Sequence, residues 1–216
     1  MTGKTSTGPT EIRLGRSNGQ TFDLLTEVGT ITRWELCDVL AAERRCAGHT
    51  RWPYSVADHS LFCWRGAVKL GASLEAQRAV LLHDLTEACG IHDMPRPIKK
   101  VLSGYRELEL AIRRQLEARW EYSLDQHAQL VHDLDMWAWY VEAKHLQGRN
   151  MGDAPKFMHE LFSCVEHDGQ NMLDAWNQVG YPGQPQAARA DHVHAAPPPR
   201  EKWLYEQFLD ILECKP

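Results

Sequence analysis

Apolar residues recur along most of the chain at spacings of three and four, the period of a helix with one buried face. This pattern begins near Thr32 and is interrupted by short stretches that contain glycine, proline or capping residues. We therefore expect the chain to be all-α. The predicted helices are at about 33–46, 56–70, 74–89, 105–120 and 124–146, with a further helical segment at 155–179.

Three of these helices have a clear start signal. Thr32 has Glu35 at its third following position, which is the pattern of a capping box. Ser55 and Ser73 stand directly before the next two apolar runs and can accept a hydrogen bond from the first turn. Helix starts after these three residues are the firmest boundaries that the sequence provides.

The two ends of the chain have different patterns. We expect residues 1–30 to be an arm followed by a hairpin or irregular lead-in, with β-capable pieces at Ile12–Leu14, Thr21–Leu25 and Gly29–Ile31. The main domain is predicted at 31–179. A proline-rich linker is predicted at 180–200, and an amphipathic helix at 201–216 that could pack on the bundle or on another subunit. The apolar face of this C-terminal helix favours a homo-oligomer.

Composition narrows the classes of partner. The formal net charge of −5 argues against a nucleic-acid partner, and no stretch has the apolar length of a membrane span, so we expect a cytoplasmic protein without a membrane partner. The six cysteines are scattered without a CxxC pair. They indicate neither a disulfide framework nor a thiolate zinc site and are interpreted as reduced thiols.

The stretch 79–99 concentrates the candidate chemistry. An apolar run leads directly into His83 and Asp84, and Glu87 follows one turn later on the same face of the predicted helix. The predicted helix stops at Gly90. Pro95 and Pro97 prevent it from continuing and predict an extended loop.

Two other helices carry similar groups in apolar surroundings: His59, and Asp135 with Asp133 beside it. A buried carboxylate is costly unless it is paired or bound to a metal, so acids on several helices indicate a shared cation. Mixed imidazole and carboxylate ligands suit divalent Co, Mn, Zn, Fe or Ni, with Mg²⁺ as an option for a second site. Taken singly, each residue has a strong ordinary alternative, and a lone histidine such as His59 is more often a partly buried side chain than a metal ligand.

The order His59, His83-Asp84, Asp135 resembles the H…HD…D signature of the HD-domain metal-dependent phosphohydrolases. The sequence that flanks this motif resembles that of the bacterial 5'-deoxynucleotidases and their phage-encoded relatives. It includes Asp93-Met94-Pro95-Arg96-Pro97-Ile98-Lys99. The resemblance covers about 31–146 and implies an HD-domain helical bundle. An HD dipeptide alone carries no such information, because His132-Asp133 and His167-Asp168 occur in the same chain.

The resemblance also implies a role for each matching residue. The implied metal ligands are His59, His83, Asp84 and Asp135. Glu87 matches the catalytic carboxylate that orients or deprotonates the attacking water, together with the metal ligand Asp84. The implied substrate contacts are Arg45 for phosphate, with Arg44 as the alternative, Asp93 for the sugar, and Lys99 as a further phosphate neighbour. Trp52 could touch the base or ribose, and packing as core or lid is an equal alternative.

The implied activity is hydrolysis of 2'-deoxynucleotides by attack of a metal-activated water on a 5'-phosphate. Two versions stay open: a 5'-nucleotidase acting on deoxynucleoside monophosphates, and a triphosphohydrolase acting on deoxynucleoside triphosphates such as dATP. An alternative from another class is a catalytically silent HD-fold protein that binds nucleotides or regulates. In each case the expected partner is a small deoxynucleotide.

Overall fold

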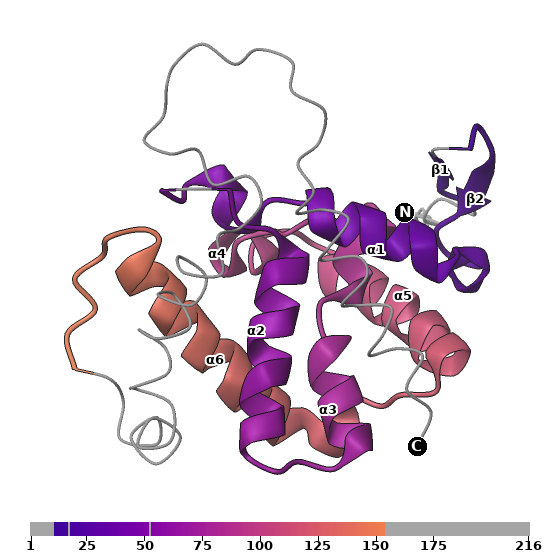
Figure 1. Ribbon diagram of the computed structural model, residues 1–216. Coiled ribbons are helices and arrows are strands. Elements are labelled where there is room, and N and C mark those ends of the chain that lie inside the picture. The colour runs from indigo at the N-terminus through magenta and orange to yellow at the C-terminus, as the bar shows by residue number, and fades with distance from the viewer. Residues whose placement is uncertain (1–10, 17, 52, 154–216) are drawn as a thin grey trace, which may run out of the picture.

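The computed structural model describes residues 11–16, 18–51 and 53–153, and this part of the chain is mostly helical (Figure 1). It contains a two-stranded sheet, six α-helices and four short 3₁₀ helices, here labelled η. In chain order they are β1 (Arg13–Gly15), β2 (Thr21–Asp23), η1 (Val28–Thr30), α1 (Arg33–Ala42), η2 (Arg45–Gly48), α2 (Val56–Lys69), α3 (Leu74–Leu81), η3 (Leu85–Cys89), α4 (Arg96–Lys99), α5 (Tyr105–Trp120), η4 (Asp125–His127) and α6 (Ala128–His145).

The predicted lead-in is a small antiparallel hairpin. Strands β1 and β2 pair with Leu14 opposite Phe22. The Asp23 carboxylate accepts hydrogen bonds from the backbone nitrogens of Ile12 and Leu25, at 3.0 and 3.1 Å. The third β-capable piece, Gly29–Ile31, was predicted wrongly, because residues 28–30 form the 3₁₀ helix η1.

The three helix starts predicted from capping residues are confirmed. Thr32 and Ser55 each form a complete capping box, with Glu35 and Asp58 as the returning carboxylates. Ser73 caps α3 by accepting from the backbone nitrogen of Ala76. Helix α5 spans the predicted residues, Tyr105–Trp120.

The predicted helix 74–89 is wrong in its second half. Helix α3 ends at Leu81, and the backbone of Leu82 and Asp84 lies near φ −100° and ψ +10°, outside α geometry. The His83 ring nitrogen Nδ1 lies 2.7 Å from the carbonyl oxygen of Val80, one of the helix-end carbonyls that lack a partner within the helix. His83 and Asp84 therefore lie in a turn, and Glu87 follows in η3.

The segment after Gly90 also differs from the prediction. An extended loop was expected at the two prolines, but Pro95 caps the short helix α4 and Pro97 lies within its first turn. Proline is tolerated there because the first helical nitrogens have no partner within the helix. The helix predicted at 124–146 begins later, since residues 125–127 form η4 before α6.

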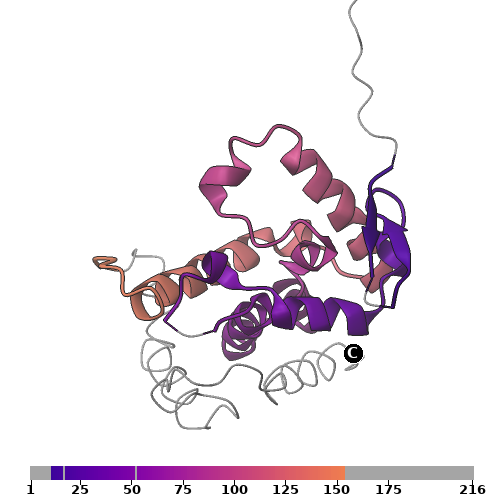
Figure 2. The ribbon, with the colours of Figure 1, turned by 90° about the horizontal axis from the view of Figure 1, so that it is seen from above.

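Two hydrophobic clusters form the core, and α2 contributes to both. One joins α2 to the hairpin region, α1, η3 and α5, and the other joins it to α3 and α6. Figure 2 looks nearly along α2 and shows the hairpin on one side and the end of α6 on the other. Every residue from Tyr54 to Cys63 is buried, so the polar groups in this part of α2 lie inside the protein.

The described part of the chain contains no helix that is both long and apolar enough to cross a membrane. The predicted helical segment at 155–179, the linker at 180–200 and the helix at 201–216 lie outside the described residues, and so does the oligomer prediction that rests on that helix.

Candidate metal centre

Three separate elements bring acids and imidazoles to one place. His59 is on the buried part of α2, His83 and Asp84 occupy the turn after α3, and Asp135 is on α6. These four are the metal ligands expected from the sequence. Because α2, α3 and α6 pack against one another, the fold itself places the four side chains together.

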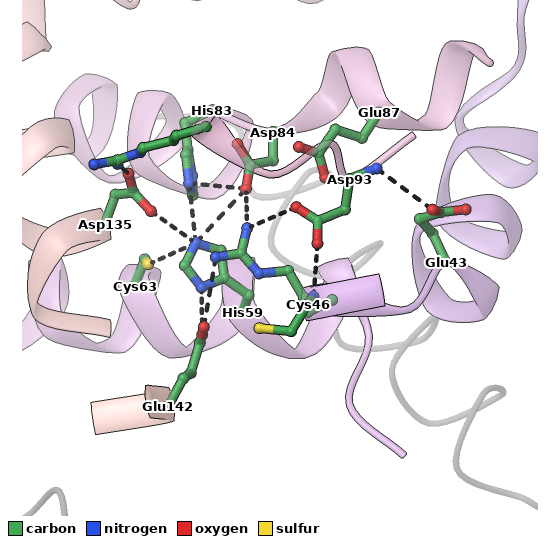
Figure 3. Close-up of polar contacts among 12 residues, drawn as sticks. Glu43, Cys46, His59, Cys63, His83, Asp84, Glu87, Asp93, Asp135 and Glu142 are labelled. Atoms are coloured by element: carbon green, nitrogen blue, oxygen red, sulfur yellow. Dashed lines mark hydrogen bonds and ion pairs between the residues drawn. The ribbon is translucent and has the colours of Figure 1, made fainter. Parts of the chain in front are cut away.

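The four groups converge on the Nε2 atom of His59 (Figure 3). This atom lies 3.2 Å from His83 Nε2 and 3.3 Å from Asp135 Oδ1. Asp84 Oδ2 is 3.6 Å from His59 Nε2 and 3.3 Å from His83 Nε2. Two ring nitrogens and two carboxylate oxygens from three elements therefore lie close together.

Each histidine has its other nitrogen bound elsewhere. His59 Nδ1 lies 2.5 Å from Glu142 Oε1, and His83 Nδ1 lies 2.7 Å from the Val80 carbonyl oxygen. If Nδ1 of each ring carries the proton in its hydrogen bond, each Nε2 has a lone pair. The two neighbouring lone pairs then repel each other unless a cation lies between them. Carboxylate or carbonyl partners on the outer nitrogen are typical of metal-binding histidines.

The residues present fit a divalent metal ion. Metal–nitrogen and metal–oxygen bonds of about 2.0–2.2 Å place neighbouring ligand atoms roughly 3.0–3.6 Å apart in octahedral or tetrahedral sites. The four separations that involve a histidine nitrogen, 3.2–3.6 Å, lie in that range. Mixed imidazole and carboxylate donors suit Mn, Fe, Co, Ni or Zn.

The two carboxylates of this cluster, Asp84 and Asp135, are held in their charged form. Burial opposes ionisation of Asp84, but His83, Arg45 and His59 outweigh it and lower the pKa of Asp84 well below its usual range. Burial likewise opposes ionisation of Asp135, while its bond with His59 lowers the pKa of that carboxyl. Charged carboxylates are the form that binds a cation.

Glu87 lies next to this cluster with an unsatisfied oxygen. Its side chain is 3% exposed, and its Oε2 atom is buried without a hydrogen-bond partner in the described part of the chain. Burial, reinforced by the nearby charge of Asp84, raises the pKa of Glu87 well above its usual range. A carboxylate with a raised pKa is able to exchange protons near neutral pH.

Arg45 supplies the main positive charge of the site. It is buried, and its Nη1 donates to Asp84 Oδ2 at 3.0 Å while Nη2 donates to Glu142 Oε2 at 3.4 Å. Its Nε is buried without a hydrogen-bond partner among the described residues. The alternative, Arg44, is exposed, so the structure brings Arg45 rather than Arg44 to the cluster.

Asp93 fixes the turn that follows Arg45. Its Oδ2 accepts from the backbone nitrogen of Cys46 at 2.7 Å, and its Oδ1 lies 3.8 Å from Arg45 Nη1. Cys46 and Ala47 have positive φ angles of 57° and 51°, unusual for residues with a side chain. Such conformations persist where surrounding contacts hold them, as this carboxylate does.

The two cations of α4 lie at the margin of the centre. Arg96 Nη2 lies 2.5 Å from Asp135 Oδ2, the carboxylate oxygen that faces away from His59. Lys99 donates to Glu109 at 2.9 Å and lies 3.9 Å from Glu87 Oε1, so it is a neighbour of Glu87. His92 is exposed and bonds Glu43, away from the four ligand atoms.

Sequence reasoning missed two residues of the centre. Glu142, 3% exposed, binds His59, Arg45 and the Tyr54 hydroxyl, and Cys63 Sγ lies 3.6 Å from His59 Nε2. A signal for Glu142 existed, since it follows Asp135 by seven residues on the same helix face inside an apolar run.

Two expected residues have a different outcome. Asp133 bonds Gln129 and not the cluster, which separates it from Asp135. Trp52 lies outside the described residues.

No protein-family model matches the chain, and no curated protein matches it. The geometry of the centre and the motifs of the sequence are therefore the basis for assigning a function.

Proposed function

We propose that the protein is a metal-dependent phosphohydrolase of the HD-domain type that acts on 2'-deoxynucleotides. The observation that carries the proposal is the convergence on His59 Nε2 of His83 Nε2 and of the carboxylates of Asp84 and Asp135, at 3.2, 3.6 and 3.3 Å respectively. These are the residues of the H…HD…D motif, and they come from segments that are far apart in the sequence.

A divalent ion bound by these residues would activate a water molecule and polarise the phosphate. Glu87 would accept the proton of that water, and two observations support this role: its buried Oε2 has no hydrogen-bond partner among the described residues, and its pKa is raised. Arg45 offers a planar guanidinium that suits phosphate oxygens and would neutralise charge developing in the displacement. Arg45 is already oriented by Asp84 and Glu142.

The substrate class follows from the motif and from the charges around it. Arg45, Arg96 and Lys99 are the cations beside this carboxylate-rich centre, and together with a bound divalent ion they would attract an anionic substrate. The turn held by Asp93 is the proposed contact for the deoxyribose. Both the monophosphate and the triphosphate version of the substrate are compatible with these groups.

The test is to incubate purified full-length protein with Mn²⁺, Co²⁺ or Zn²⁺ and with dAMP or dATP, and to identify the released anion. Orthophosphate from dAMP would support a 5'-nucleotidase, and triphosphate from dATP a triphosphohydrolase. No turnover of any deoxynucleotide with any of these metals would refute the proposal, and binding without turnover would favour the silent alternative.

A matched pair of variants links turnover to this site. Asp135→Asn removes a ligand charge, whereas Asp133→Asn makes the same change two residues away on α6, at a carboxylate that bonds Gln129. We expect loss of turnover only in Asp135→Asn. Equal activity of the two variants would show that hydrolysis occurs elsewhere.

A further inference from the structure

Cys63 lies at the metal centre although nothing in the sequence pattern assigns it there. It follows His59 by one turn of α2, so both side chains project from the same face of that helix. Cys63 is fully buried, and its Sγ lies 3.6 Å from His59 Nε2. The ligand atoms of His59, Cys63 and His83 all lie within 4.8 Å of one another, and Figure 3 shows the sulfur directed at the His59 ring.

We propose that Cys63 is an additional protein ligand of the metal ion and makes the centre selective for Zn²⁺, Co²⁺ and Fe²⁺ over Mn²⁺ and Mg²⁺. The inference rests on the metal site of the proposed function, but it does not depend on which nucleotide is hydrolysed. On binding, the S–H bond is replaced by a sulfur–metal bond and the proton leaves to solvent.

The distance agrees with shared coordination. Zinc–sulfur bonds of about 2.3 Å and zinc–nitrogen bonds of about 2.0–2.1 Å, at the angles of about 90–120° between neighbours in a five-ligand site, place the two ligand atoms roughly 3.1–3.8 Å apart. The Sγ–Nε2 separation is 3.6 Å. The competing role for the thiol is donation to the Leu134 carbonyl oxygen, at 3.7 Å, near the outer limit for a sulfur hydrogen bond.

A thiolate in the ligand set changes which ions are preferred. Two imidazoles and two carboxylates alone accept Mn²⁺ readily, whereas a soft sulfur donor strengthens binding of Zn²⁺, Co²⁺ and Fe²⁺ much more than that of Mn²⁺ or Mg²⁺. We therefore expect the protein to bind Zn²⁺, Co²⁺ and Fe²⁺ more tightly than Mn²⁺, and the difference in affinity to depend on Cys63.

Cobalt spectroscopy tests ligation directly. Full-length protein loaded with one equivalent of Co²⁺ should show thiolate-to-cobalt charge-transfer absorption in the near ultraviolet. Cys63→Ala and Cys63→Ser should lose that absorption while keeping the visible bands of bound cobalt. Cys37→Ala is the matched control, because Cys37 is also buried but lies on α1 in the other hydrophobic cluster. It should keep the absorption.

Metal competition titrations give a second readout. Cys63→Ser should lower Zn²⁺ affinity by roughly tenfold or more, at least the loss seen when outer partners of a metal site are removed. Its Mn²⁺ affinity should change far less. Circular dichroism checks that the variants fold, and Cys63→Ser keeps the side-chain volume should Cys63→Ala not fold.

The outcomes separate this inference from the proposed function. Cobalt bound without charge-transfer absorption in the native protein, or absorption that persists in Cys63→Ser, would overturn the role of Cys63 and leave the hydrolase proposal intact. Failure of the native protein to bind Co²⁺ and Zn²⁺ would overturn the role of Cys63, and failure to bind Mn²⁺ as well would overturn both.

Discussion

At the residue scale, the centre depends on groups that orient the ligands as well as on the ligands. Glu142 binds His59 Nδ1 at 2.5 Å and also contacts Arg45 at 3.4 Å, so one buried carboxylate orients both side chains. Burial opposes its ionisation, but His59 and Arg45 outweigh burial and lower the pKa of Glu142. Its negative charge therefore makes the His59 ring a better donor to a cation.

The first prediction concerns this positioning role. Glu142→Gln keeps the shape of the side chain and removes its charge, so we expect metal affinity to fall by about 10–100-fold while the helices remain folded. Competition titration with Zn²⁺ measures the change, and Asp133→Asn on the same helix is the control. Unchanged affinity would mean that Glu142 has only a structural role.

The second prediction concerns Glu87. Glu87→Gln cannot accept a proton, so kcat should fall by roughly 10²–10⁴-fold, the usual contribution of a general base. Metal affinity should stay near that of the native protein, since Glu87 is not among the four converging ligands. Steady-state kinetics together with metal titration makes the comparison, and Glu75→Gln, an exposed carboxylate on α3, should behave like the native protein.

The sequence predicts the four converging residues better than the residues that contact them. His59, His83, Asp84 and Asp135 stand out because acids and imidazoles inside apolar runs are costly without a partner. Cys63 does not stand out, because a buried cysteine in an apolar helix is common. Only the packing of α2 against the other helices shows that its sulfur reaches the His59 ring.

At the element scale, α2 is the helix on which the centre depends, because it carries His59 and packs against α6, which carries Asp135 and Glu142. The close approach of the two helices requires Gly66. A Cβ at that position would lie 2.7 Å from Leu134 Cδ2 and 3.3 Å from Trp137 Cζ3. The Trp137 ring is itself stacked on Phe62, with ring centres 4.3 Å apart, so it has little room to move.

The third prediction follows from that contact. Gly66→Val should destabilise the protein by about 1–3 kcal/mol, the cost of overpacking a core, although valine is the better helix former. It should also weaken metal binding, because α2 and α6 carry ligands of one ion. Thermal unfolding and metal titration measure the two effects.

Ala118→Val is the control for Gly66→Val, since Ala118 is exposed on α5 and only helix propensity changes there. If the two variants had the same stability, the α2–α6 contact would not be tight in solution.

Elements with a local signal could be predicted from the sequence, and elements fixed by distant contacts could not. The capping boxes at Thr32 and Ser55 set the starts of α1 and α2 through bonds within four residues. The end of α3 is different, because the apolar run continues past it. The His83 ring binds the Val80 carbonyl there and also contacts His59, which is on α2. Periodicity alone does not show that break.

At the scale of the whole molecule, the centre concentrates negative charge inside a protein that is already acidic. The net charge is −5, and the centre gathers five carboxylates: those of Asp84, Glu87, Asp93, Asp135 and Glu142. Arg45 is the one fully buried cation among the described residues that faces them. Without a metal, repulsion among these groups opposes the packing of α2, α6 and the turn after α3.

The last prediction is that metal binding stabilises the whole fold. An ion that binds only the folded state adds about 2.7 kcal/mol of stability at a concentration 100 times its Kd. For a protein of this size, that corresponds to a rise in Tm of about 5–10 °C. Thermal unfolding of chelator-treated protein, with and without added Zn²⁺ or Mn²⁺, measures the shift.

The shift should disappear in the variants that remove a ligand and persist in those that do not. His59→Ala deletes the ring at the middle of the cluster and should abolish the effect, whereas Asp133→Asn should retain it. The same stabilisation in His59→Ala would show that the ion binds at another place. Loss of the shift only in ligand variants would instead mean that the ion links three elements, α2, the turn after α3 and α6, so that metal occupancy and tertiary packing form one equilibrium.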